Sequence, residues 1–265
     1  MPATDFVLTP AESKRLIARA VHKMEPVARA LQDGTVLICT GSTNAFVAEE
    51  ILGRKFPHYQ YLTGNTTPSV SGAKDLFPAA RRPDVVLRKG KIDPDLDRFS
   101  VLEHMQPDDV YIKGANAINY AQGMAGILIG GFGGAGTIGS GWGHIVGRRL
   151  RLVIPAGLEK CIADDIFAVA DRLNQHDEYD PDAPRMMPVF GEIVTEIEAL
   201  RILTGAEAYH IASGGIAGAE GAVRLLVEGS RGEFEAAKKL LEDIAGEPPF
   251  LDNVSGEIDG EDSWS

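Results

Sequence analysis

The feature that most constrains the fold is a strand–turn–helix pattern in residues 35–52, TVLICTGSTNAFVAEEIL. Val36 to Cys39 is a short apolar run of the length expected for a strand buried on both faces. Small polar residues then form a turn, and a helix follows it, with apolar residues at helical spacing and with Glu49 and Glu50 on its wetter side. Backbone N–H groups at such a helix start lack partners, and the helix dipole favours an anion there. We therefore predict a phosphate or carboxylate site at Thr40, Gly41, Ser42, Thr43 and Asn44. The alternative is that Ser42 or Thr43 caps the helix.

Three further apolar runs, at 109–112, 125–129 and 151–154, alternate with helical patterns and predict a mostly parallel sheet covered on both sides. In such sheets, ligands bind beyond the carboxyl ends of the strands. The first run is followed by three candidate ligand-binding residues, Lys113, Gly114 and Asn116. The second run is followed by a glycine-rich turn with five more candidates: Gly131, Gly133, Gly134, Gly136 and Thr137. We expect both turns to meet the 40–44 turn at one edge of a three-layer α/β domain.

Composition narrows the class of protein. Hydrophobic residues at 44% and charged residues at 24% are ordinary for a globular protein, and the net charge of -12 argues against a nucleic-acid surface. Two cysteines, Cys39 and Cys161, are typical of a reducing compartment and indicate no disulfide framework. The first residues do not resemble a signal peptide, and no apolar run approaches the ~20 residues of a membrane span. We expect a cytoplasmic protein with neither membrane nor nucleic acid as a partner.

The C-terminal third predicts a second domain. An acidic, proline-bearing connector separates a ligand-binding domain at 1–180 from a small domain at 186–255, and an acidic tail follows at 256–265. The small domain shows a βαββαβ order, with its first strand at 187–193 and its last near 250–254, which is the ferredoxin-like pattern. We expect it to close over the first domain or to dimerise beside it, and therefore expect a homo-oligomer.

Other stretches carry local predictions. Thr9 to Glu12 has the pattern of a capping box that starts a long helix, in which Pro26 could introduce a kink. Residues 54–80 are rich in turn formers and are predicted to form a rim or lid, with one short strand at 59–62. Residues 84–88 predict a further strand.

Three of these segments resemble a known superfamily. CTGSTNAFVAEEI resembles the phosphate-loop segment of the type A ribose phosphate isomerases, and DDVYIKGANAIN resembles their second motif. ILIGGFGGAGTIG stands where their lysine-plus-glycine loop would be. Glucosamine-6-phosphate deaminases and family I CoA transferases share this fold. The resemblance covers roughly residues 10–175 and implies a small phosphorylated or carboxylated metabolite as ligand. Coenzyme A is the one cofactor that it allows; otherwise we expect none.

The residues that carry proton transfer in these isomerases differ here. Lys113, Asn116 and Ala117 stand in place of two Asp and one Glu, and the glycine-rich turn has no lysine. A 1,2-proton shift needs a general base of tunable pKa, which Lys113 could be only if burial strongly lowers its pKa. Glu103 is the other candidate catalytic residue. Two functions therefore stay open: an enzyme that isomerises or transfers a sugar phosphate or CoA thioester, or a non-catalytic sensor or complex subunit that keeps the pocket.

Each candidate has a structural alternative. Lys113 could bind an anion or form a salt bridge in the wall, and Asn116 could contact a ligand or stabilise its own turn. The glycine cluster could contact phosphate or serve close helix–sheet packing; no acidic residue follows the next strand, so NAD is not expected. Glu103 with His104 could be an acid–base pair or a solvated one, and Cys39 could be a reactive thiolate or an inert strand residue. Histidine spacing predicts no metal site.

Overall fold

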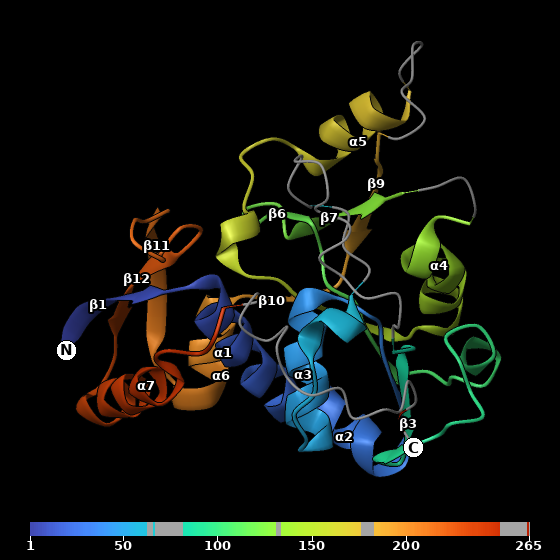
Figure 1. The fold of residues 1–265 in the computed structure, drawn as a ribbon, viewed down its shortest axis with the longest axis horizontal. Helices are drawn as coiled ribbons and strands as arrows, with labels where there is room; N and C mark the ends of the chain where they lie inside the picture. The colour runs from blue at the N-terminus through green and yellow to red at the C-terminus, as the bar shows by residue number, and fades with distance from the viewer. Residues whose placement is uncertain (63–65, 67–81, 131–133, 176–182, 250–263, 265) are drawn as a thin grey trace.

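The computed structural model describes residues 1–62, 66, 82–130, 134–175, 183–249 and 264, and in these it shows a mixed α/β chain with three sheets (Figure 1). Several sequence predictions fall outside the described residues. These are the strand at 250–254, nearly all of the acidic tail, residues 176–182 of the connector and most of the 54–80 stretch. None of the described helices has both the length and the hydrophobicity that crossing a membrane would require.

The central sheet has six strands in the order β10-β8-β5-β2-β3-β4. Its strands are β2 (Thr35–Ile38), β3 (Val85–Arg88), β4 (Lys91–Ile92), β5 (Val110–Ile112), β8 (Arg151–Pro155) and β10 (Glu192–Val194). The first four in the spatial order are parallel to one another, whereas β3 and β4 add an antiparallel hairpin. Ile38 pairs with Ile112, and Ile112 pairs with Val153, so β2, β5 and β8 end at the same edge. This confirms the strands predicted at 36–39, 84–88, 109–112 and 151–154. The strand from the 84–88 run, β3, is antiparallel to β2.

Helices cover both faces of the central sheet. On one face, four helices pack over Val36 and Ile38: α1 (Pro10–Lys23), α2 (Glu25–Asp33), α3 (Ser42–Leu52) and α6 (Glu196–Thr204). On the other face, α4 (Gly136–Arg148) packs Ile138 and Ile145 against Leu37 and Tyr111. Alternate residues of β2 therefore enter two different cores, as expected of a strand buried on both sides.

Helix starts follow the sequence signals. The Thr9 side chain accepts from Glu12 N, and the Glu12 carboxylate accepts from Thr9 N, so the predicted capping box is confirmed. The predicted long helix is broken at Met24, which ends α1 and precedes α2, with Pro26 in the first turn of α2 where its missing N–H costs nothing.

Two smaller antiparallel sheets flank the central one. The first consists of β1 (Ala3–Leu8), β12 (Val223–Glu228) and β11 (Glu207–Ser213), and α7 (Arg231–Ile244) contacts β12. The second consists of β6 (Ala117–Asn119), β7 (Met124–Ile129) and β9 (Arg185–Phe190), packed against α5 (Ile166–Asn174). Figure 1 shows these two sheets on different sides of the molecule, with β10 running between them. Three short 3-10 helices are η1 (His58–Tyr61), η3 (Val101–Glu103) and η4 (Leu158–Lys160).

Strand pairing differs from the sequence prediction at three places. The predicted strand at 125–129 forms, but as β7 it pairs with β6 and β9 instead of joining the parallel sheet. The predicted strand at 187–193 is divided at Gly191 into β9 and β10, and β10 pairs with β8 of the central sheet. The third strand beside β11 and β12 is β1, from the N-terminus. Residues 58–61 form a 3-10 helix where a strand was predicted.

Candidate functional site

The carboxyl ends of three adjacent parallel strands surround one cavity of about 410 Å³. We call it the strand-end cavity; it is lined by Thr66 and by residues 40–44, 113–116 and 159–162. These three ranges follow β2, β5 and β8 in turn. The location agrees with the general rule for open α/β sheets, and the volume suits a small metabolite.

The 40–44 turn leads into α3 without a side-chain cap. Gly41 is the N-cap residue, and no side chain caps the helix start, so neither Ser42 nor Thr43 takes the capping role. The turn is instead held from outside: Thr40 N donates to Asp84 Oδ1 at 2.6 Å, and Gly41 N donates to Tyr61 O at 2.9 Å. The positive end of the α3 dipole therefore faces the strand-end cavity.

Two buried polar atoms of this turn lack a hydrogen-bond partner within the described part of the chain. They are Thr43 Oγ1, on a residue 2% exposed, and Asn44 Oδ1, on a residue 0% exposed. The Asn44 amide group has a structural role, because Nδ2 donates to Cys39 O at 2.7 Å and to Ile112 O at 3.2 Å, which ties α3 to the ends of β2 and β5. Buried polar groups without partners are costly, which makes Thr43 Oγ1 an unusual feature of this turn.

Lys113 lies at the end of β5 with its ammonium donating to Gly114 O at 3.4 Å. Burial lowers its pKa from the ordinary value of 10.5, and the positive charges of Lys160 and Arg98 lower it further. No ion pair involves Lys113 in the part of the chain that the structure describes, so the alternative of a salt-bridged wall residue does not apply there. Lys113 and Lys160 thus bring two amine groups to the same cavity.

The glycine-rich turn lines a second, smaller cavity of about 170 Å³. Gly136 and Thr137 line it together with Lys113 and Asn116, which also line the strand-end cavity, so the two cavities adjoin at these side chains. Gly134 and Gly136 adopt the left-handed backbone conformation that favours glycine. Gly131 and Gly133 lie outside the described residues.

Close packing accounts for part of the glycine content here. A Cβ at Gly141 of α4 would lie 2.7 Å from the Tyr111 ring, and the Tyr111 hydroxyl donates to Thr137 O at 2.7 Å. Asn116 likewise supports its own neighbourhood, because Asn116 Oδ1 accepts from Leu128 N at 2.9 Å. The glycine-rich turn was predicted to meet the 40–44 turn at one site. It instead lines the adjoining smaller cavity, because β7, which precedes it, belongs to another sheet.

Glu103 is not part of either cavity. Its side chain is 67% exposed and lies 3.2 Å from His144 Nε2 and 3.4 Å from Arg148 Nη2, on the side of α4. The prediction that Glu103 is a proton-handling group near Lys113 is not met by this geometry, and the Glu103–His104 pair is solvated. Glu103 is close to Lys113 in the sequence. It lies in η3, which precedes β5 and is apart from the carboxyl end of that strand.

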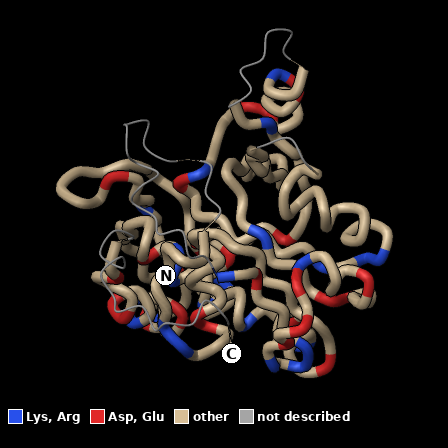
Figure 2. The backbone as a smooth tube through the Cα atoms, turned by 45° about the vertical axis from the view of Figure 1, so that its right-hand side comes forward, with Lys and Arg blue, Asp and Glu red and all other residues tan. Residues whose placement is uncertain are grey.

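Both cysteines are free. Burial raises the pKa of Cys39 to about 12, which excludes the reactive reading and leaves an inert strand residue. Burial and two nearby glutamates raise the pKa of Cys161 to about 11. No group of three or more His, Cys, Asp or Glu side chains in the described ranges could hold a metal ion. In the view of Figure 2, basic and acidic residues lie interspersed along the tube.

Sequence reasoning missed Glu159, Lys160 and Glu196. Glu159 and Lys160 follow β8 in η4 and line the strand-end cavity. Glu196 is the first residue of α6, is 0% exposed and accepts from Leu158 N at 2.9 Å. Glu159 and Lys160 could have been predicted from the sequence. The run at 151–154 was predicted as a strand, and its carboxyl end leads into Gly157-Leu158-Glu159-Lys160.

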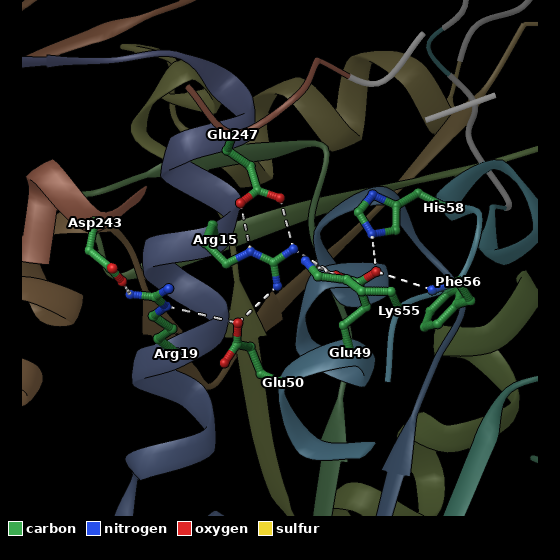
Figure 3. A network of polar contacts seen from close by, with 9 residues as sticks. All are labelled: Arg15, Arg19, Glu49, Glu50, Lys55, Phe56, His58, Asp243 and Glu247. Atoms are coloured by element: carbon green, nitrogen blue, oxygen red, sulfur yellow. Dashed lines mark hydrogen bonds and ion pairs between the residues drawn. The ribbon is translucent and has the colours of Figure 1, made fainter. Parts of the chain in front are cut away.

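A buried charge network holds α3 in place (Figure 3). The Arg15 guanidinium of α1, with a side chain 3% exposed, contacts three carboxylates: Glu49 at 2.6 Å, Glu50 at 2.8 Å and Glu247 at 2.8 Å. Burial alone would raise the pKa of Glu49, but His58, 3.0 Å away, and Arg15 outweigh it and lower that pKa to about 2. Glu49 was predicted on the wetter side of its helix, which is wrong: it is 5% exposed.

Comparison of the chain with models of protein families, with curated proteins and with solved structures found no match in any of the three.

Proposed function

We propose that this chain binds a small phosphorylated or carboxylated metabolite in the strand-end cavity. The observation that carries the proposal is Thr43 Oγ1, a buried hydroxyl without a partner at the uncapped start of α3. An anionic oxygen would accept from this hydroxyl and from the free N–H groups of the helix start. Lys113 and Lys160 would supply the opposite charge.

The same features support the resemblance to the isomerase and CoA-transferase superfamily as a proposal. The segment that resembles the phosphate loop follows β2, and the segment that resembles the second motif includes β5, which pairs with β2. A three-layer arrangement is supported by helices on both faces of the central sheet. The ferredoxin-like arrangement of residues 186–255 has less support, because β10 pairs with β8 and β1 pairs with β12. The division at 180, the homo-oligomer and the cytoplasmic location stay predictions.

Anion binding can be tested with the full chain and two simple probes, sulfate and inorganic phosphate. A ligand that binds only the folded state stabilises it by about 2.7 kcal/mol at 100 times its Kd, which thermal unfolding detects readily. We expect both anions to raise Tm, and the double variant Ser42→Ala with Thr43→Ala to lose that response. In the absence of anion the variant should be nearly as stable as the parent, because Thr43 Oγ1 forms no hydrogen bond.

The matched control is Thr204→Val. The Thr204 hydroxyl donates to Leu200 O within α6, and Thr204 does not line the cavity, so its response to anions should stay at the parental level. An equal response of the parent and the double variant, or no response of the parent to either anion, would contradict the proposal.

Sugar phosphates, CoA thioesters and nucleotides then identify the class of metabolite by the same assay. Product analysis with the ligand that binds best separates an enzyme from a sensor. A ligand that is bound but unchanged over hours indicates a sensor or complex subunit, whereas conversion indicates an isomerase or transferase. The absence of Glu103 from the cavity leaves Lys113 as the only catalytic candidate that the motifs place in it.

A further inference from the structure

Two glutamates, one of which lines the strand-end cavity, each have a buried carboxylate oxygen without a hydrogen-bond partner among the described residues. They are Glu159 Oε2 in η4 and Glu196 Oε1 at the start of α6. Glu196 is fully buried, and its other oxygen accepts from Leu158 N at 2.9 Å. Glu159 is half-buried and lines the cavity.

The two oxygens face the same point. A Cβ built on Gly157 would lie 1.9 Å from Glu159 Oε2 and 2.9 Å from Glu196 Oε1, so the oxygens are within about 5 Å of each other. Gly157 leaves the space that this approach requires. Two ionised carboxylates so close, both shielded from water, repel each other strongly.

A single proton removes this conflict. One proton on the pair cancels one of the two charges and turns one carboxylate into a hydrogen-bond donor. The electrostatics agree with this arrangement: burial and the charge of Glu159 raise the pKa of Glu196 to about 7.

Charged and titratable groups face the pair from each neighbouring element. From α1, Ser13 lowers the pKa of Glu196, and Lys14 has a pKa lowered to about 8 by burial and by Lys160. From η4 and the residue after it come Lys160 and Cys161. Lys14 and Lys160 stabilise one negative charge on the pair, but neither donates a hydrogen bond to an unpartnered oxygen.

We propose that Glu159 and Glu196 share one proton and that Glu159 exchanges this proton with the ligand of the strand-end cavity. The second half of this inference rests on the proposed function; the first half does not. The pair would supply the acid–base group that the Lys113–Ala117 turn lacks. Because an anion beside Glu159 favours the protonated form, occupation of the cavity and protonation of the pair should support each other.

The test is a pH titration of the full chain labelled with ¹³C at the glutamate carboxyl carbon and followed by NMR. In the parent, one glutamate signal should titrate near pH 7 and should be missing in Glu196→Gln. In Glu159→Gln, the midpoint for Glu196 should fall by about one pH unit, because a like charge is lost and an amide donor is gained. Glu103→Gln, an exposed glutamate outside both cavities, should leave the midpoint unchanged.

Sulfate tests the link to the cavity, because it stays a dianion throughout this pH range. We expect saturating sulfate to raise the midpoint of the pair in the parent and not in the Ser42→Ala, Thr43→Ala double variant. If sulfate fails to bind at all, the proposed function fails, while the titration without sulfate still decides whether the proton is shared.

Three results would overturn the inference. The first is a parent protein in which no glutamate titrates above pH 6, and the second is a Glu196 midpoint that does not move in Glu159→Gln. The third is a midpoint that falls on addition of Mg²⁺ or Ca²⁺ at constant ionic strength, which would indicate that the two carboxylates bind a cation in place of a proton.

Discussion

Replacing Arg15 by methionine should destabilise the protein by about 3 kcal/mol, because it removes a buried cationic partner from the carboxylate of Glu49. Arg15 and Glu49 have side chains only 3% and 4% exposed and lie 2.6 Å apart (Figure 3). The Arg15 guanidinium also lies over the Phe46 ring, 4.7 Å from its centroid, and methionine loses this cation–π contact together with the ion pairs, so the loss is mainly electrostatic. The value lies at the lower end of the range for a broken buried pair, because His58 stays 3.0 Å and Lys55 3.1 Å from Glu49.

The assay is urea unfolding at pH 7, with the free energy of unfolding extrapolated to water. The matched control is Arg19→Met on the same helix. Arg19 is 29% exposed and its partner Asp243 is 64% exposed, so the control should cost less than about 1 kcal/mol.

A double variant, Arg15→Met with Glu49→Gln, separates the two sources of the loss. Removing the unpaired charge should recover a large part of the stability lost in Arg15→Met alone. If Arg15→Met is no more destabilising than Arg19→Met, the buried network does not hold α3 in the way we describe.

Three further outcomes are expected. Glu196 has a folded-state pKa of about 7 against 4.5 when unfolded, so the stability that its protonation contributes is present below pH 4.5 and lost as the pH rises through 7. Relative to Glu196→Gln, the parent should therefore lose on the order of 3 kcal/mol between pH 4.5 and 8 in denaturant titrations, and parallel curves would contradict this. Gly141→Ala should lower stability by about 1–3 kcal/mol because its Cβ meets Tyr111, whereas Gly143→Ala on the same helix, with open space around it, should be neutral or stabilising; thermal unfolding distinguishes them. Cys39 should stay unreactive toward a thiol reagent in native protein at pH 8 and react only after unfolding, and rapid native labelling would show that its thiol is accessible.

Local sequence signals predicted the elements that carry the site. The apolar runs that became β2, β5 and β8 are bounded by turn residues, and the Thr9–Glu12 capping box has a fixed spacing, so each can be recognised without knowledge of distant residues. The strand-end rule also placed Thr40 to Asn44 and Lys113 at one edge, where the strand-end cavity lies.

Long-range pairing could not be predicted in the same way. The run that became β7 has the periodicity of a buried strand, but its sequence does not specify that β6 and β9 are its partners. The pairing of β1 with β12 joins residues more than 200 positions apart, for which no local pattern exists. As a result, the glycine-rich turn was assigned to the main cavity in place of the turn after β8.

Side-chain burial was the other limit. Glu49 and Glu196 are charged residues of helices, and helical periodicity places such residues toward solvent. Both are buried because residues distant in sequence contact them: Arg15 and His58 for Glu49, and the Leu158 backbone for Glu196. A buried charge is recognised only when its partner is known.

The most direct test of the central claim is to map sulfate binding on the backbone N–H signals of the ¹⁵N-labelled chain by NMR. The account predicts the largest shift changes at Ser42 and Thr43, followed by Gly114 and Lys160, all with one common Kd. Shift changes that leave the start of α3 unaffected, or that spread over basic surface residues without saturation, would contradict it.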